Sequence, residues 1–123
     1  MISNNQTYNL FLTEDYSAKE IVNFLYQEIS IVHSPNRFKA VIENLELLVD
    51  RLKLEIYNLK THLIYKIGMQ LRSFSSRLKE AIYFLENLIY KNSSEFKIGK
   101  EYKLKKLQQM KHEIAVLGLY LEV

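Results

Sequence analysis

Residues 41–67, VIENLELLVDRLKLEIYNLKTHLIYKI, decide the fold of this chain. Apolar side chains recur in this stretch at steps of three and four residues, which places them on one face of an α-helix. The members of this stripe are Val41, Leu45, Leu48, Leu52, Ile56, Leu59, Leu63 and Ile67. They predict a helix of about thirty residues, close to 45 Å long at 1.5 Å per residue. Because an apolar face of this length must be buried, further helices are expected to pack against it.

A second helix is predicted upstream, where Ser17 and Glu20 form a capping box. The serine hydroxyl can accept from the amide of the third helical residue, and the glutamate can reach back to the serine amide. Tyr16 can also pack on Ile21 as a hydrophobic staple. We expect this helix to end near His33 and to bury one apolar face. That face holds Ile21, Phe24, Leu25, Ile29 and Val32.

Three further signals divide the rest of the chain. Ser34-Pro35 starts the long helix, with serine as the cap and proline at the first helical position. Residues 73–76, Ser-Phe-Ser-Ser, are the expected place for a bend, and residues 92–94, Asn-Ser-Ser, are an expected loop. The apolar stripe continues on both sides of that loop. Its later members are Leu78, Ile82, Leu85 and Ile89, then Leu104, Leu107, Met110, Ile114, Leu117 and Leu121.

The predicted architecture is a single all-α domain over residues 1–123. Three glycines and one proline are too few for the turns of a sheet protein. Four or five helices in an antiparallel bundle, with one long central helix, would bury the apolar faces. Residues 1–15 show no clear periodicity, and we expect them to be irregular or flexible.

Composition excludes several classes of protein. The chain of 123 residues is 48% hydrophobic and contains no cysteine, so disulfides, zinc fingers and thiol chemistry are excluded. The opening residues lack the basic region and cleavage site of a signal peptide. No uncharged apolar stretch approaches the roughly 18 residues that a membrane span needs. We therefore expect a cytoplasmic protein without a membrane span.

Candidate catalytic groups are sparse. His33, His62 and His112 are isolated from one another, without the spacing of metal ligands. The carboxylates Glu43, Glu46 and Asp50 share one helix face, which is typical of a solvated stripe. The sequence thus predicts no enzyme, no metal and no cofactor.

Charge is distributed unevenly along the chain. Residues 1–50 hold three Lys/Arg against seven Asp/Glu, whereas residues 51–123 hold fourteen against seven. Tyrosine precedes lysine at 65–66, 90–91 and 102–103, and cations interleaved with aromatic rings suit nucleic acid. Two readings stay open here: a polyanion-binding face, or a solvated lysine face with tyrosines at its boundary.

Residues 58–70, NLKTHLIYKIGMQ, resemble a helix signature of the small subunit of type III-A CRISPR effector complexes, the Csm complex. Residues 16–25, YSAKEIVNFL, and 112–121, HEIAVLGLYL, are similar to its first and last helices. Lys60, Tyr65 and Gly68 match the signature. Val22 and Met69 stand where the family has arginine, and Gly118 stands where it has tyrosine.

The resemblance implies a non-catalytic helical subunit that lies against CRISPR RNA paired with its target, beside other effector subunits and further copies of itself. Gly68 would then allow close approach of a helix or of RNA, although tight helix packing alone would also explain it. The residues predicted to contact the RNA backbone are Lys60, Tyr65, Lys66, Arg72 and Arg77.

Two other functions are compatible with the sequence. One is a bacteriocin-immunity-like protein, which residues 6–12 faintly resemble and in which residues 114–119 would form an exposed protein-binding surface. The other is a phage or plasmid protein that self-associates through its long helix.

Overall fold

Helices form nearly all of the described structure in this computed structural model, which covers residues 4–14, 16–28, 35–62, 65–91 and 99–121. The predicted all-α class is confirmed, since these residues contain helices and no strand. The helices are α1 (Asn4–Thr13), α2 (Ala18–Glu28), α3 (Pro35–His62), α4 (Tyr65–Lys91) and α5 (Lys100–Leu119).

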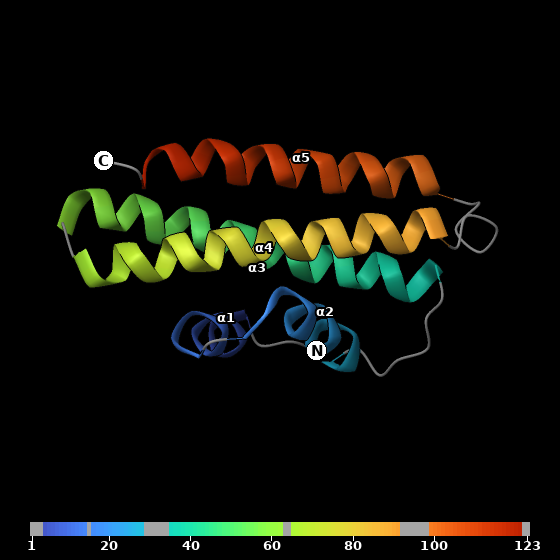
Figure 1. Cartoon of the computed structure of the whole chain (residues 1–123), viewed down its shortest axis with the longest axis horizontal. Helices are drawn as coiled ribbons and strands as arrows, with labels where there is room; N and C mark the ends of the chain where they lie inside the picture. Colours follow the sequence, from blue (N-terminus) through green and yellow to red (C-terminus); the bar gives the residue numbers. More distant parts are fainter. Residues whose placement is uncertain (1–3, 15, 29–34, 63–64, 92–98, 122–123) are drawn as a thin grey trace.

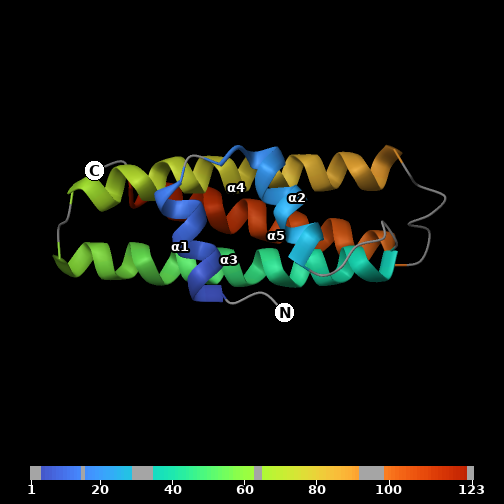
Figure 2. The same ribbon diagram turned by 90° about the horizontal axis from the view of Figure 1, so that it is seen from below.

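The two longest helices, α3 and α4, lie side by side and form the centre of the molecule (Figures 1 and 2). On one side, α5 runs along the pair and contacts both members. On the opposite side, α1 and α2 cross the pair and also contact both members. The α3–α4 pair is therefore covered from two directions by helices of different length and orientation.

The core consists of the apolar stripes that the periodicity predicts. On α3 the described stripe, from Val41 to Ile56, is buried, and the stripes of α4 and α5 are buried against it. Its members on α4 and α5 include Leu78, Ile82, Leu85, Ile89, Leu107, Met110, Ile114, Leu117 and Leu121. Helical spacing alone therefore identifies most of the core.

Both predicted helix starts are confirmed. The Ser17 amide donates to Glu20 Oε1 at 3.1 Å, and the Glu20 amide donates to Ser17 Oγ at 3.2 Å, which completes the capping box of α2. Because the Ser17 backbone amide donates to its carboxylate, helped by the Ser17 hydroxyl, the pKa of Glu20 is lowered. Pro35 is the first residue of α3. The expected cap at 34, the end of α2 near 33 and the loop at 92–94 lie outside the described residues.

The prediction of an irregular N-terminus is wrong, because Asn4–Thr13 forms α1. Tyr8 and Phe11, one turn apart, are fully buried. The Tyr8 ring meets Phe74 edge to face at 5.1 Å, and the Phe11 ring meets Phe24 at 5.2 Å. A ten-residue helix is marginal in water, so these tertiary contacts stabilise α1.

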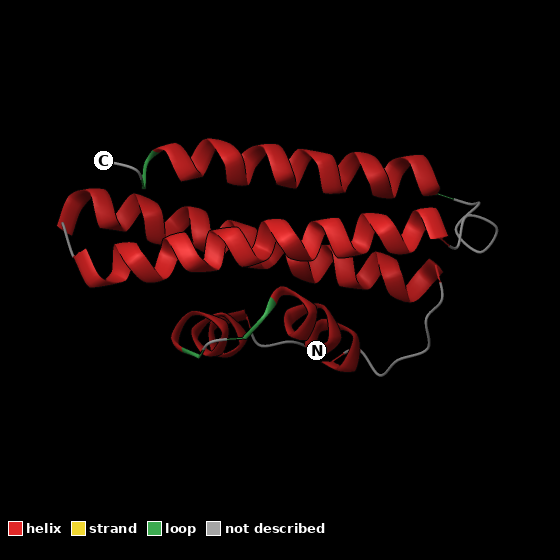
Figure 3. Cartoon of the chain, in the orientation of Figure 1, coloured by secondary structure: helices red, strands yellow, loops and turns green. Residues whose placement is uncertain are grey.

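The predicted length of the long helix, about thirty residues, agrees with the 28 residues of α3, but the expected bend at residues 73–76 is wrong. The chain leaves α3 at His62 and starts α4 at Tyr65, and α4 continues without a bend through residues 73–76 (Figure 3). Phe74 and Ser75 are both buried, so packing holds this segment helical against the modest cost of serine. The apolar stripe stays in phase across the real break, which explains why periodicity did not reveal it.

Candidate nucleic-acid interface

Three of the predicted RNA contacts lie at one end of the bundle. Lys60 is near the end of α3, and Tyr65 and Lys66 begin α4. Gly68 follows in the same helix and is half-buried. The side chains of Lys60, Tyr65 and Lys66 lie outside the described part of the structure. Their role in RNA contact and the close approach at Gly68 therefore stay predictions.

Arg72 holds the C-terminal turn of α5 against α4. Its Nε donates to the carbonyl oxygen of Leu121 at 2.6 Å, and a second guanidinium nitrogen, Nη2, donates to the same oxygen. Since a charged donor strengthens a hydrogen bond to a carbonyl, this contact fixes the register of the two helices at one end.

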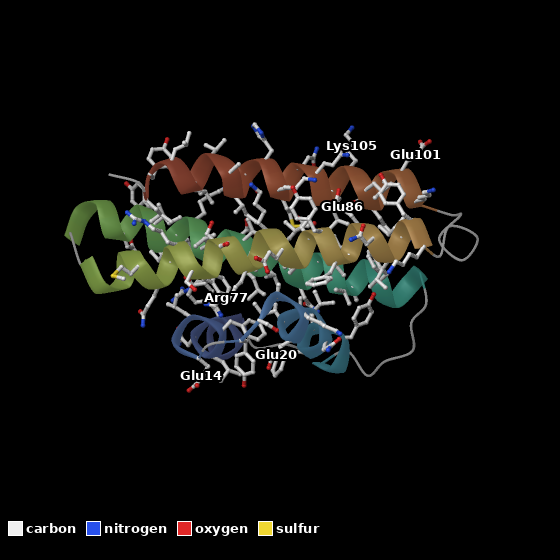
Figure 4. The ribbon with its side chains drawn as sticks, in the orientation of Figure 1. Glu14, Glu20, Arg77, Glu86, Glu101 and Lys105 are labelled. Atoms are coloured by element: carbon white, nitrogen blue, oxygen red, sulfur yellow. The ribbon has the colours of Figure 1, made fainter. Side chains whose placement is uncertain are left out.

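Arg77 fixes the opposite edge of α4. One of its terminal nitrogens donates to the carbonyl oxygens of Glu14 and Tyr16, at 3.3 and 2.9 Å, in the connection between α1 and α2 (Figure 4). Its guanidinium also lies 5.6 Å from the centre of the Phe74 ring. The structure therefore does not bring Arg72 and Arg77 together, because one faces α5 and the other faces the N-terminal helices.

Cations and tyrosines do meet where α4 lies against α5. Lys111 Nζ is 4.7 Å from the centre of the Tyr83 ring, and Lys100 Nζ is 5.6 Å from the centre of the Tyr90 ring. Lys111 also pairs with Glu86 of α4 at 3.1 Å, and Figure 4 shows Glu86 between the two helices. Both tyrosines stay about half exposed.

Two further cations lie on the same face of α4 as Tyr83. Arg72 and Lys79 precede Tyr83 by about three turns and one turn on the same face of α4. Lys79 is exposed and forms no ion pair within the described residues. We name this surface the α4–α5 seam. It consists of Arg72, Lys79, Tyr83, Glu86, Tyr90, Lys100 and Lys111.

The other edge of α5, facing α3, is electrically balanced. Lys53 Nζ pairs with Glu113 at 2.5 Å, and Lys106 Nζ pairs with Glu46 at 3.5 Å. The neighbouring Glu113 carboxylate raises the pKa of Lys53 above its usual value. These four residues, which we name the α3–α5 seam, contribute two positive and two negative charges. The α4–α5 seam contributes four positive charges and one negative charge.

One lysine of the basic segment is not available at the surface. Lys103 belongs to the buried stripe of α5, where burial lowers its pKa, helped by the nearby Lys39 ammonium. Gly99 caps this helix with φ of 75°, and a Cβ at Gly99 would lie 3.3 Å from Lys103 Nζ. The Lys103 side chain therefore runs back toward the start of α5 at Gly99, whereas the preceding residue, Tyr102, is exposed.

In the described helices, lysine meets a tyrosine ring at spacing i, i+4 or across two helices, not within the adjacent Tyr-Lys pairs 90–91 and 102–103. Residues i and i+1 point to different sides of a helix, whereas partners come from i+4 or from another helix. Tyr102 lies beside Lys106, at 5.8 Å, and this spacing could have been found from the sequence. The contacts of Tyr83 and Tyr90 join different helices and depend on their register.

No cluster of three or more His, Cys, Asp or Glu side chains occurs in the residues that the structure describes. Glu46, one of the three carboxylates that share a face of α3, is instead engaged by Lys106. Among the described helices, none is both long and apolar enough to cross a bilayer.

Comparisons with protein-family models, curated proteins and solved structures give no match to this chain.

Proposed function

We propose that the protein is a non-catalytic helical subunit that binds the phosphate backbone of RNA along the α4–α5 seam. The observation that carries this proposal is the charge imbalance of that seam, where Glu86 is the single carboxylate among four cations. The resemblance to the Csm small subunit extends the proposal to a type III CRISPR effector complex, in which catalysis would belong to other subunits.

The proposed mechanism is electrostatic. Lys79 and Lys100 neutralise phosphates of the backbone and release the counterions that these phosphates hold, while Lys111 stays paired with Glu86. Tyr83 and Tyr90 lie seven residues apart, about 10 Å along α4, and hold the Lys111 and Lys100 ammonium groups over their rings. Phosphate contacts of this kind carry no base information, so binding is independent of sequence.

The arginines enter this mechanism as positioning residues. Arg72 fixes the register of α4 and α5 through Leu121, and that register brings Lys111 to Tyr83. Arg77 anchors the connection between α1 and α2 and lies away from the seam.

A salt series on matched variants tests the proposal. The seam variant is Lys79→Gln/Lys100→Gln, and its control is Lys53→Gln/Lys106→Gln, which removes the same charge from the α3–α5 seam. We expect the logarithm of the affinity for a 20-nucleotide RNA to fall steeply with the logarithm of salt concentration. In the seam variant the slope should be smaller by about 1.4 for single-stranded RNA, from two lost phosphate contacts.

The control variant should keep the wild-type slope, because its lysines already share their charge with carboxylates. Absence of RNA binding at low salt, or equal losses in the two variants, would contradict the proposal. Circular dichroism on both variants checks that the helices remain intact.

A second candidate function is protein binding by the last turns of α5, as in the bacteriocin-immunity-like reading. Val116, Leu119 and Tyr120 are exposed there, while Ile114 and Leu117 point into the core. Exposed apolar side chains at a helix end are typical of an interaction surface. If this is the function, the wild-type protein protects producing cells from a bacteriocin, and Leu119→Asn abolishes that protection without affecting helicity.

A further inference from the structure

The outer face of α3 carries an apolar stripe that no other described helix covers. Leu47, Leu54 and Tyr57 are 43%, 56% and 68% exposed, although α3 has a complete buried stripe on its inner face. With Glu43 and Asp50 they form a row at positions 43, 47, 50, 54 and 57. Steps of four and three residues place all five side chains on one face. We name this row the outer α3 stripe.

The two carboxylates of the stripe form no salt bridge within the described residues. Lys39 is exposed and lies one turn before Glu43 on the same face, without a salt bridge in the described residues. The other basic side chains nearby have partners of their own. Arg51 pairs with Glu55 at 3.0 Å, and Lys53 pairs with Glu113 across the α3–α5 seam. Glu43 and Asp50 therefore add two negative charges to an exposed row of apolar side chains.

The stripe has the four-and-three spacing of a helix-pairing surface, with apolar side chains at 47, 54 and 57 and carboxylates at 43 and 50. Apolar residues separated alternately by four and three positions form the contact line of paired helices, where side chains of one helix fill the spaces between those of the other. Leu47 and Leu54 are one heptad apart, and so are Glu43 and Asp50. A partner helix would meet apolar and negatively charged positions in regular alternation.

We infer that the outer α3 stripe binds an amphipathic helix of a partner protein that presents leucine-like side chains flanked by Lys or Arg. The apolar positions would cover Leu47 and Leu54, and cations one heptad apart would meet Glu43 and Asp50. Charge complementarity selects this partner, because opposite charges that meet across an interface favour one partner over others.

The stripe does not suit a polyanion, since both of its charged members are carboxylates. It lies on α3, whereas the α4–α5 seam lies along the other two long helices, and Figure 2 shows α3 and α4 at opposite edges of the bundle. The inference is therefore independent of the proposed RNA binding.

Two synthetic peptides test the inference with the full-length protein. Each has 21 residues with leucine at heptad positions a and d, and the e and g positions are lysine in one and glutamate in the other. Like charges at these positions keep each peptide from pairing with itself. In calorimetry, we expect the lysine peptide to bind at least about tenfold more tightly than the glutamate peptide. A difference of this size corresponds to one or two favourable charge contacts.

Substitutions in the stripe should change this preference in two ways. Leu47→Ser/Leu54→Ser should lower the affinity for the lysine peptide by about tenfold or more, because the apolar contact is lost. Glu43→Lys/Asp50→Lys should reverse the order of the two peptides. Reversal, rather than simple loss, is an outcome that a folding defect cannot produce.

Matched variants elsewhere on the surface control for unspecific effects. Glu80→Lys/Glu101→Lys makes the same charge change at exposed carboxylates of α4 and α5, and Leu119→Ser removes an exposed leucine of α5. Both should leave the peptide preference unchanged, and Leu47→Ser/Leu54→Ser should leave RNA affinity unchanged.

Three results would overturn the inference. The first is equal affinity for the two peptides, and the second is an equal effect of the control variants. The third is self-association of the wild-type protein in sedimentation equilibrium that Leu47→Ser/Leu54→Ser abolishes, because a second copy of the chain would then be the partner.

Discussion

The two edges of α5 contain the same kinds of residues but differ in charge. On the α3 side, Lys53 and Lys106 each meet a carboxylate from the other helix. On the α4 side, Lys100 and Lys111 lie over tyrosine rings, and a single carboxylate, Glu86, is present. The chain has a net charge of +3. Where that positive charge appears on the surface depends on which lysines have a carboxylate partner, and composition does not show this. The surface is basic where the register of α4 and α5 places few carboxylates beside the lysines.

The ion pairs of the two seams also differ in burial. The side chains of Lys53 and Glu113 are 50% and 43% exposed, whereas those of Lys111 and Glu86 are 27% and 9% exposed. Exposed pairs contribute about 0–1 kcal/mol because water screens both charges. A pair that is largely withdrawn from water contributes to stability mainly through the cost of leaving one partner unpaired.

The largest effect that separates the seams is expected at their glutamates. Glu86→Gln leaves Lys111 without its carboxylate in a partly buried position, so the free energy of unfolding should fall by about 1–3 kcal/mol. Glu113→Gln, the same change in the exposed pair, should lower it by about 0.5 kcal/mol or less. Urea unfolding of the two variants measures this difference, and equal losses would contradict the contrast between the seams.

Glu86→Gln has a second expected consequence. It removes the only carboxylate of the α4–α5 seam, so its affinity for RNA should rise while its stability falls. Opposite changes of affinity and stability in one variant distinguish an electrostatic surface from a merely destabilised protein.

A smaller effect is expected from the tyrosines of the α4–α5 seam. Tyr83→Leu/Tyr90→Leu removes the rings that hold two ammonium groups in place. The released lysine side chains lose rotamer freedom when RNA binds, at a cost of about 0.5–1 kcal/mol, so RNA affinity should fall by about two- to fivefold. Tyr102→Leu, which removes an exposed ring of α5 beside Lys106, should leave affinity unchanged.

Phenylalanine gives the conservative comparison at the same positions. Tyr83→Phe/Tyr90→Phe keeps the rings and should bind RNA as the wild type does. A loss as large as that of the leucine variant would indicate that the hydroxyl groups, and not the rings, act in the seam.

The smallest effect is expected in how Lys53 and Lys103 contribute to stability as pH changes. It is measured as the difference in the free energy of unfolding between wild type and each Lys→Met variant from pH 8 to 11.5. The pKa of Lys53 is raised by Glu113, so its contribution is complete below the ordinary value of 10.5 and is lost as pH rises through the folded-state pKa. The pKa of Lys103 is lowered by burial, so its unfavourable contribution is relieved as pH rises toward 10.5.

Lys53→Met should therefore be less stable than wild type at pH 8, and Lys103→Met should be more stable. At high pH both variants should approach the stability of wild type, Lys53→Met from below and Lys103→Met from above. The same sign for both variants would mean that burial of Lys103 has no electrostatic cost.

Arg72 and Arg77 show that the charge pattern of the sequence does not reveal the tertiary partners of an arginine. Both were predicted to contact RNA because they lie in the basic second half of the chain. In the folded chain Arg72 donates to Leu121, and Arg77 donates to Tyr16. These partners are 49 and 61 residues away, so nothing in the local sequence distinguishes such an arginine from a surface arginine.

The sequence by itself determined the helical class, the buried faces and two helix starts. Periodicity near 3.6 residues, the capping box at Ser17 and the proline at 35 act through neighbours within one or two turns. Only the tertiary structure decided that α1 is a helix, that the long helix ends at His62 and that Lys111 meets Tyr83. Those outcomes depend on burial and register between segments far apart in the chain, which local spacing does not encode.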